Sequence, residues 1–231
     1  MREIVLDTET TGLDPNDGDR VVEIGAVELI NHIPTGRTYQ EYINPERHMP
    51  AEAEKIHGIS EAFLADKPVF AAIAEGFLAF LEMDGQGEPS PGTLVIHNAS
   101  FDMKFLNSEL KRLGHEAIAD SRVIDSLQLA RQRFPGAPAN LDALCRRFDV
   151  DTSARTKHGA LLDSELLAEV YLGLIGGRQP GLDLSIEGSG KKASVTREKI
   201  ARPPRPHAPT APELEAHQAF LQTIKNPLWN R

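Results

Sequence analysis

The sequence predicts an α/β fold in which a mixed five-stranded sheet is flanked by helices and followed by a flexible C-terminal tail. Strand-like and helix-like segments alternate through residues 1–175, and the connections between them are short. The first three strand-like segments follow one another without a helix, which is typical of an antiparallel meander. Prolines and basic residues gather after residue 175, where the alternation stops.

The predicted sheet begins with three strands, at Glu3–Thr8, Arg20–Ile30 and Arg37–Ile43. Apolar residues at helical spacing then predict a helix at about 69–82. The later elements alternate: a buried strand at Thr93–His97, a helix at Phe101–Leu113, a short strand at Val123–Ile124, and helices at about 125–133, 140–147 and 161–174. Parallel strands joined by helices should cross over right-handed. This order of elements is that of the ribonuclease H-like architecture.

Composition divides the chain into three regions. Residues 176–231 hold 7 of the 16 prolines, and they carry 9 basic against 5 acidic side chains in a protein whose net charge is −9. A proline-rich, basic segment with few aromatic residues cannot bury enough apolar area to fold alone. We therefore expect a folded domain at 1–175, a flexible linker at 176–212 and a terminal segment at 213–231 that regains helical character.

Hydropathy, cysteine content and net charge also exclude several classes of protein. No apolar run approaches the roughly 20 residues of a membrane span, and the N-terminus lacks the pattern of a signal peptide. Cys145 is the only cysteine, so a disulfide within the chain is impossible and a reducing, cytoplasmic location is expected. The negative charge argues against a protein that coats DNA. It allows a nuclease, because bound cations can neutralise the phosphates of a few nucleotides.

Two carboxylates close the first predicted strand. Asp7 and Glu9 point to the same side of it, opposite Ile4 and Leu6, because side chains two residues apart share a face. Two adjacent carboxylates repel each other unless a cation lies between them. The alternative is a solvated strand face, which explains most acidic pairs with this spacing.

A third carboxylate follows the buried strand at 93–97. Asp102 lies in the first turn of the next helix, which Ser100 or Asn98 can cap. Ligand sites in open α/β sheets favour this edge, at the carboxyl ends of the strands. The alternative is that Asp102 only complements the helix dipole.

The last helix of the domain supplies a fourth carboxylate and a histidine. Asp163 lies on the helix, whereas His158 lies in the loop that enters it, where Gly159 permits an unusual backbone. The alternative for His158 is a surface loop histidine.

Together these segments supply four carboxylates and one histidine. Two divalent cations about 3.5–4 Å apart can clamp the attacking and leaving oxygens of a phosphodiester. Magnesium and manganese prefer carboxylate and water ligands. A histidine that titrates near neutrality can take a proton from the attacking water. The set therefore predicts metal-dependent cleavage of a phosphodiester.

The acidic segments resemble the three exonuclease motifs of the DEDDh family, and the residues agree in type, order and spacing. They are Asp7-x-Glu9-Thr10-Thr11-Gly12, Asn98-x-x-Phe101-Asp102 and His158-x-x-x-x-Asp163. Over residues 1–175 the chain is also similar to the epsilon subunits of bacterial DNA polymerase III. The segments that carry this likeness are Ile56-His57-Gly58-Ile59, Val123-Ile124-Asp125-Ser126-Leu127, Phe134-Pro135-Gly136, Leu141-Asp142-Ala143-Leu144-Cys145 and the stretch from Arg155 to Asp163.

The resemblance implies a 3′→5′ DNA exonuclease that proofreads for the replicative polymerase and releases nucleoside 5′-monophosphates. It implies that His158 is the general base and that two Mg²⁺ or Mn²⁺ ions bind the four carboxylates, Asp7, Glu9, Asp102 and Asp163. The residues implied near the terminal nucleotide of a single-stranded or frayed 3′ DNA end are Thr10, Glu52, Ile56 and His57. Core packing is an equal alternative for Ile56 and for Phe101. A supporting hydrogen bond is expected from Asp125.

The tail carries two further signals. Residues 179–184, Gln-Pro-Gly-Leu-Asp-Leu, resemble the sliding-clamp-binding peptides of bacterial replication proteins, with Gln179, Leu182 and Leu184 as the contacts. Residues 213–231 hold apolar residues near helical spacing, and a short isolated helix is marginal in water. We therefore expect this segment to bind the polymerase catalytic subunit, the alternative being that it packs on the 1–175 domain.

The sequence also allows two other interpretations of the function. An exonuclease that trims RNA or oligonucleotides would use the same five residues, but it has no obvious need for a clamp peptide and a docking helix. A catalytically silent scaffold between clamp and polymerase would not need the intact carboxylates and histidine.

Overall fold

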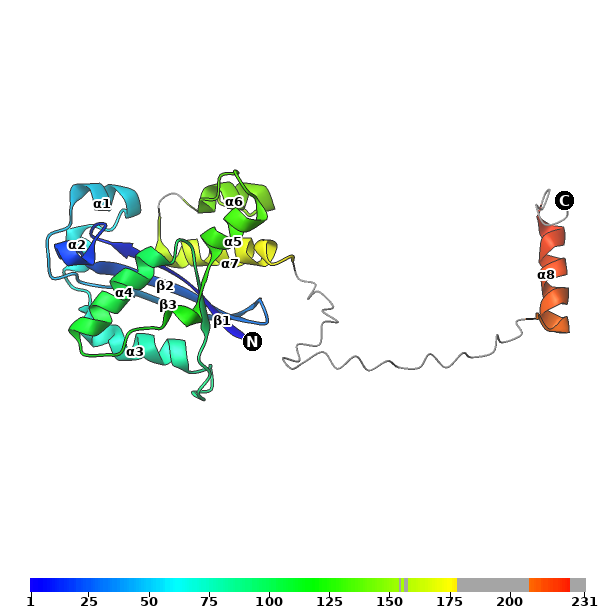
Figure 1. The fold of residues 1–231 in the computed structure, drawn as a ribbon, viewed down its shortest axis with the longest axis horizontal. Helices are drawn as coiled ribbons and strands as arrows, with labels where there is room; N and C mark the ends of the chain where they lie inside the picture. Colours follow the sequence, from blue (N-terminus) through cyan, green and yellow to red (C-terminus); the bar gives the residue numbers. More distant parts are fainter. Residues whose placement is uncertain (154, 156–157, 178–207, 225–231) are drawn as a thin grey trace, which may run out of the picture. The chain divides into compact units, whose positions relative to one another are not determined.

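The computed structural model describes residues 1–153, 155, 158–177 and 208–224. The chain forms two compact units, residues 1–184 and 185–231. The first is a sheet with helices on both faces, and the described part of the second is the helix α8 (Ala211–Thr223) (Figure 1). The expected clamp-binding residues 179–184 lie outside the described residues.

The sheet is mixed and five-stranded, as the sequence predicts, with the strand order β3-β2-β1-β4-β5. β1 pairs antiparallel with β2, as does β2 with β3, whereas β1 with β4 and β4 with β5 are parallel. The strands are β1 (Arg2–Thr10), β2 (Val21–Ile30), β3 (Ile33–Tyr42), β4 (Thr93–Ile96) and β5 (Val123–Asp125). Since β1 and β4 are parallel neighbours, their carboxyl ends lie at the same edge of the sheet.

Helices cover both faces of the sheet (Figure 1). Ile4 and Leu6 of β1 pack in the large core beneath α3 (Phe70–Glu82) and α4 (Ser100–Arg112). Val5 faces the opposite way and packs with residues of α7 (Ala160–Leu174). The remaining helices on that side, α5 (Ser126–Arg133) and α6 (Leu141–Phe148), share a third cluster with α7 that includes the buried Cys145. The alternation along β1 therefore sends its odd-numbered side chains toward the α7 face.

The sequence prediction missed two helices between β3 and α3 and two short 3-10 helices elsewhere. The helices α1 (Ala51–His57) and α2 (Glu61–Leu64) occupy a stretch for which no element was predicted, and the single-turn 3-10 helices η1 (Pro15–Asp17) and η2 (Asp120–Arg122) were missed as well. α1 ends at Gly58, whose φ of 78° is left-handed and suits glycine. The third strand also begins at Ile33, four residues before the predicted start.

The second unit is described by its helix alone. α8 begins at Ala211, so the last residues of the expected 176–212 linker are helical. Its first turn carries a capping box, in which Thr210 and Glu213 bond reciprocally. Leu214 and Phe220 are exposed on this helix. In the described parts of the chain, no helix is both long and apolar enough to cross a membrane.

Candidate active site

The strand β1 brings two carboxylates to the carboxyl edge of the sheet. Asp7 and Glu9 follow Val5 on the α7 face, as the alternation predicts, and both are half-buried. The register between β1 and β2 shifts after Glu9, where the strand ends in a bulge. Thr8 points to the other face and donates a hydrogen bond from Oγ1 to Oδ1 of Asp102, at 2.7 Å.

Asp102 enters the same region from α4. It is buried, with 3% of its surface exposed, and lies in the first turn of the helix as predicted. The predicted side-chain cap is wrong, because the N-cap is Ala99 and no side chain caps the helix. Asn98 instead adopts a left-handed φ of 63°. Its backbone N–H donates to Oδ1 of Asp125 at 3.2 Å, so Asp125 makes the supporting hydrogen bond expected of it.

The start of α7 supplies the third part of the site. Asp163 is buried in its first turn, and His158 lies two residues before the helix with its side chain 49% exposed. Nδ1 of His158 lies 3.2 Å from Oδ2 of Asp163. The unusual backbone expected at Gly159 is wrong, because its φ of −157° is ordinary extended backbone. One ligand atom each of Glu9, His158 and Asp163 can be chosen so that all lie within 4.8 Å of one another.

Burial and, after it, repulsion between neighbouring carboxylates raise pKa values in this cluster. Burial, together with Asp102, Glu9, Asp163 and Glu23, raises the pKa of Asp7 well above its ordinary value. Burial and the neighbouring carboxylates Asp163, Glu23 and Asp102 raise the pKa of Glu9 to about 8, and burial raises the pKa of Asp102 to about 7. Carboxylates that resist ionisation in this way fit a bound divalent cation, which relieves their repulsion.

An arginine that the sequence analysis did not single out contacts the same cluster. Arg155 binds Asp163 through two bonds, with Nε 2.6 Å from Oδ1 and a terminal nitrogen 2.7 Å from Oδ2. It also pairs with Asp142 and lies 2.7 Å from Nδ1 of His158. Nδ1 can donate to Asp163 or accept from Arg155, but one nitrogen cannot do both.

A cavity of about 350 Å³ adjoins Glu9 on the side of α1. All four residues implied near the nucleotide line it, and they are Thr10, Glu52, Ile56 and His57. Core packing is excluded for Ile56, which is 58% exposed. His57 is buried and its Nδ1 accepts the backbone N–H of Ile59 at 3.0 Å, whereas Phe101 both lines the cavity and packs on Phe105.

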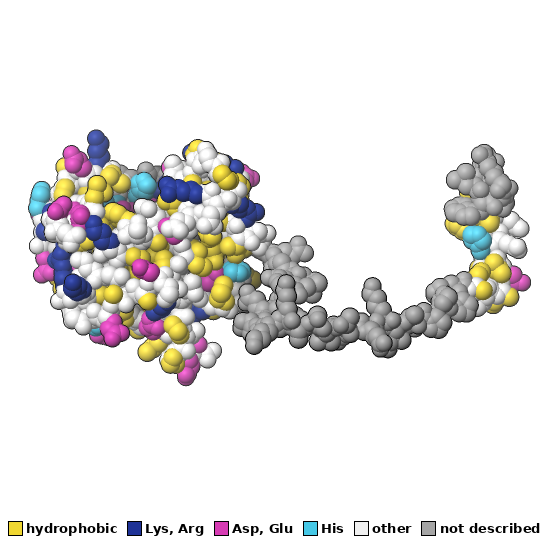
Figure 2. All heavy atoms as spheres, in the orientation of Figure 1, with side chains coloured by type: hydrophobic (Ala, Val, Ile, Leu, Met, Phe, Trp, Pro, Cys, Tyr) yellow, Lys and Arg dark blue, Asp and Glu magenta, His cyan; other side chains and the backbone are white. Residues whose placement is uncertain are grey.

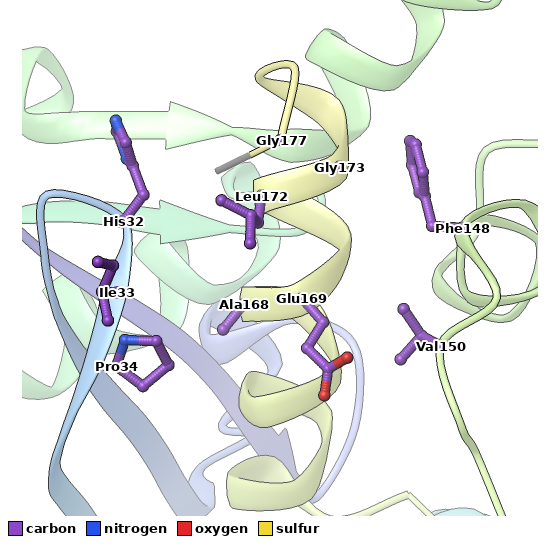
Figure 3. Close-up of a pocket in the computed structure, with 10 residues that line it drawn as sticks. All are labelled: His32, Ile33, Pro34, Phe148, Val150, Ala168, Glu169, Leu172, Gly173 and Gly177. Carbon is purple, nitrogen blue, oxygen red and sulfur yellow. The ribbon is translucent and has the colours of Figure 1, made fainter. Parts of the chain in front are cut away.

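A second cavity, of about 450 Å³, lies away from the carboxylates (Figure 3). One wall is formed by His32 in the turn between β2 and β3 and by Ile33 and Pro34 at the start of β3, and α7 lies in the middle of the view. Phe148 and Val150 form the opposite side. Glu169 is the only carboxylate among the described residues that line it, so this cavity lacks the acidic cluster that a metal site needs.

Comparison with known proteins agrees with this geometry. The family model described as "Exonuclease", RNase_T, matches residues 4–171. A Rickettsia felis protein named DNA polymerase III subunit epsilon is 50% identical over 230 residues, which cover 97% of each chain. The chain belongs to the epsilon family of exonucleases. The Escherichia coli K12 protein of the same name is 41% identical over 236 residues, covering 97% of this chain and 93% of that one.

Solved structures show the same fold. Exonuclease X, in complex with 5′ overhanging duplex DNA, is 25% identical with a TM-score of 0.55, covering 74% of this chain and 90% of that one. The nuclease domain of 3′hExo, a DEDDh family member bound to rAMP, has a TM-score of 0.64 at 18% identity, covering 75% and 91%. The predicted ribonuclease H-like fold and the predicted class, a proofreading 3′→5′ exonuclease, are thereby confirmed. Membership of this family also implies divalent metal ions.

The epsilon-family site holds one further buried acid that the sequence analysis missed. Glu23 of β2 lies directly across the strands from Glu9 and is 1% exposed. Its signal in the sequence is a charged residue between the apolar Val22 and Ile24, one of two glutamates in a strand whose other residues are apolar.

Proposed function

We propose that this epsilon-family chain hydrolyses the terminal phosphodiester of single-stranded or frayed 3′ DNA ends and releases nucleoside 5′-monophosphates. The observation that carries the proposal is the convergence of carboxylates from β1, α4 and α7 beside a cavity lined by residues of α1. The relatives named DNA polymerase III subunit epsilon, matched over nearly their whole length, favour DNA over the RNA-trimming alternative.

The four carboxylates are the proposed holders of two divalent cations, with His158 nearby as the general base. Bound Mg²⁺ or Mn²⁺ would supply positive charge for the scissile phosphate and the leaving oxygen. Asp163 accepts a hydrogen bond from His158 when Nδ1 carries the proton, and Nε2 then keeps the free lone pair that a base needs. Asp102 is held by Thr8 and is thereby fixed in orientation. The four residues proposed to bind the cations are Asp7, Glu9, Asp102 and Asp163.

The cavity beside Glu9 is the proposed place of the terminal nucleotide. Thr10 and Glu52 supply polar groups at its wall. Ile56 offers an exposed apolar side chain on which a base or sugar can pack, and His57 closes the wall from a buried position. The space of about 350 Å³ is within the range of small-molecule sites.

The C-terminal tail, residues 176–231, is proposed to bind the protein partners. Residues 179–184 bind the sliding clamp through Gln179, Leu182 and Leu184, and residues 213–231 bind the polymerase catalytic subunit. The relatives' names, which are those of a polymerase subunit, support the second assignment. The exposed apolar residues Leu214 and Phe220 of α8 support it as well. The linker between the two peptides falls in the proline-rich, basic part of the sequence.

Digestion of a 3′-labelled, mispaired primer by the full chain tests the activity. We expect hydrolysis only after Mg²⁺ or Mn²⁺ is returned to the chelated protein. Asp7→Ala, Asp102→Ala and Asp163→Ala should each lower turnover by several orders of magnitude while the fold survives. Glu75→Ala is the control, because Glu75 is 86% exposed on α3 and lies outside the site. Near-normal activity in all three site variants would exclude the assignment.

A further inference from the structure

The helix that carries Asp163 begins without a cap of its own. The first four backbone N–H groups of a helix have no partner inside the helix, and a side chain at the N-cap usually satisfies one of them. The N-cap of α7 is Gly159, which has no side chain to do so. The start of α7 therefore depends on groups from elsewhere in the chain.

Glu23 of β2 supplies the missing acceptor. Its Oε2 accepts the backbone N–H of Ala160, the first residue of α7, at 3.1 Å. Its Oε1 accepts a hydrogen bond from Nε2 of Gln40 at 2.8 Å, which fixes the orientation of the carboxylate. A carboxylate at a helix N-terminus is also stabilised by the helix dipole.

Two further contacts join the same strand to the same helix turn. A Cβ atom on Gly25 would collide with the backbone of Ala160 and Leu161, so only glycine allows α7 to approach β2 this closely. Ser164 is fully buried and donates from Oγ to the carbonyl oxygen of Gly25 at 2.9 Å. β2 therefore contacts the start of α7 at three points.

We propose that Glu23 is a positioning residue, which fixes the first turn of α7 so that Asp163 and His158 meet Glu9. Glu23 and Glu9 are register partners, so the same strand pair sets the place of the carboxylate on β1 and of the helix that must face it. This inference rests on the proposed roles of Asp163 and His158. It assigns to Glu23 an effect through α7 and no contact with substrate.

A second buried glutamate on the same strand provides the comparison. Glu28 is 4% exposed and its carboxylate accepts hydrogen bonds from Arg2, Thr35 and Arg37. It points to the other face of the sheet, because it lies five positions after Glu23 and side chains an odd number of positions apart on a strand face opposite ways. A buried acid that only supports the fold should therefore behave like Glu28.

The test measures Mn²⁺ affinity by calorimetry, together with kcat and KM on the labelled primer, for full-length Glu23→Ala, Glu23→Gln and Glu28→Ala. Glu23→Ala should weaken Mn²⁺ binding and lower kcat by about 10–100-fold, the usual cost of losing a group that orients a metal ligand, with little change in KM. Glu23→Gln should restore most of both, because its amide oxygen can accept the Ala160 N–H while the amide of Gln40 turns over. Glu28→Ala should lower the melting temperature and leave Mn²⁺ affinity unchanged.

The outcomes distinguish failure of the positioning role of Glu23 from failure of the proposed nuclease function. Unchanged Mn²⁺ affinity and kcat in Glu23→Ala would overturn the positioning role, as would a Glu23→Gln protein as impaired as Glu23→Ala. If Glu23→Ala fails to fold, Ser164→Ala removes one of the other two contacts and should weaken Mn²⁺ binding in the same direction. A normal Mn²⁺ affinity in that variant would then count against the proposal. Failure of the proposed function itself would show as an inactive parent protein.

Discussion

The active-site carboxylates make the stability of the metal-free protein depend on pH. The pKa of Glu9 rises from 4.5 to about 8 on folding, and that of Asp102 from 3.8 to about 7. Between these limits the folded chain keeps protons that the unfolded chain has released, so folding stability falls as pH rises. We expect the melting temperature in EDTA to fall from about pH 5 to about pH 8.

The variant Glu9→Gln tests how much Glu9 contributes to this pH dependence of stability. It removes a charge that Asp163, Glu23 and Asp102 repel, so the variant should be more stable than the parent at high pH and its pH dependence shallower. Saturating Mg²⁺ should stabilise the parent more than the variant, because a ligand stabilises only the state that binds it. A metal-free melting temperature that rises with pH through this range would contradict the electrostatics described above.

Substitution of His158 distinguishes its proposed role as general base from the role of the proposed metal ligands. Its ring lies close enough to Glu9 and Asp163 to serve either as a base or as a further ligand. If it is the base, His158→Ala should keep Mn²⁺ affinity while losing about 10²–10⁴-fold in kcat near neutral pH. The loss should shrink at high pH, where hydroxide can substitute. A large drop in Mn²⁺ affinity, or an unchanged pH–rate profile, would remove His158 from the role of base.

At the residue scale, the sequence reveals groups that lie in local motifs and hides those that act across the fold. Asp7 and Glu9 were predictable because strand alternation alone puts them on one face. Arg155 was not predicted, although it lies only eight residues before its partner Asp163, because no single helix or strand spans the two residues. Glu23 was not predictable, because its partner Ala160 lies 137 residues later in the chain and only tertiary packing brings the two together. The mistaken cap at Ser100 has the same origin, since Asp125 of a neighbouring strand holds the turn before α4.

At the scale of elements, α1 forms one wall of the cavity and offers a direct test of nucleotide binding. Ile56→Ala should raise KM with little change in kcat, because its side chain is 58% exposed and free to pack on a base. Losing a partly buried apolar contact of this size costs about 1–2 kcal/mol, a factor of about 5–30 in affinity. Ile33→Ala is the matched control, since Ile33 is 61% exposed and lies at the start of β3. Equal KM values in both variants would remove Ile56 from the substrate site.

The elements that the sequence missed lack the patterns on which prediction depends. α1 buries only Ala53 and His57, so it shows no apolar stripe. β3 begins with Ile33 and Pro34 and continues with further exposed residues, a pattern that is typical of a turn. Proline is tolerated there because β3 is an edge strand of the sheet. Long elements with strong periodicity, such as α3 and α7, were placed within a residue or so of their observed ends.

At the scale of the whole chain, the proposed division of labour in the tail can be tested with purified partners. Deleting residues 213–231 should abolish polymerase binding and leave hydrolysis of free single-stranded DNA intact. The intact hydrolysis is the internal control for folding. Pull-down with the polymerase catalytic subunit measures the loss. Undiminished binding of the truncated chain would show that the polymerase recognises another surface.

The clamp assignment needs a separate variant. Changing Gln179, Leu182 and Leu184 together to alanine should weaken capture by the purified sliding clamp and leave polymerase binding unchanged. Clamp binding would then hold the nuclease near the primer end, and a short connection of this kind gives an effective concentration of about millimolar. Weak intrinsic DNA binding suffices under that condition, which suits a protein with a net charge of −9. Equal clamp capture by parent and variant would refute the peptide assignment.

The chain contributes the first and last parts of its nuclease site from opposite ends of one domain. β1 is the central strand of the sheet, and α7, the helix that must face it, ends at Leu174. While the ribosome is still making the chain, Asp7 and Glu9 are present long before Asp163 exists. If Asp163 binds a metal ion as proposed, a nascent chain cannot cut DNA until α7 has emerged and docked, whatever part of the sheet has formed. Under the proposed roles, the order of translation would by itself keep a partly synthesised chain inactive, without any inhibitor.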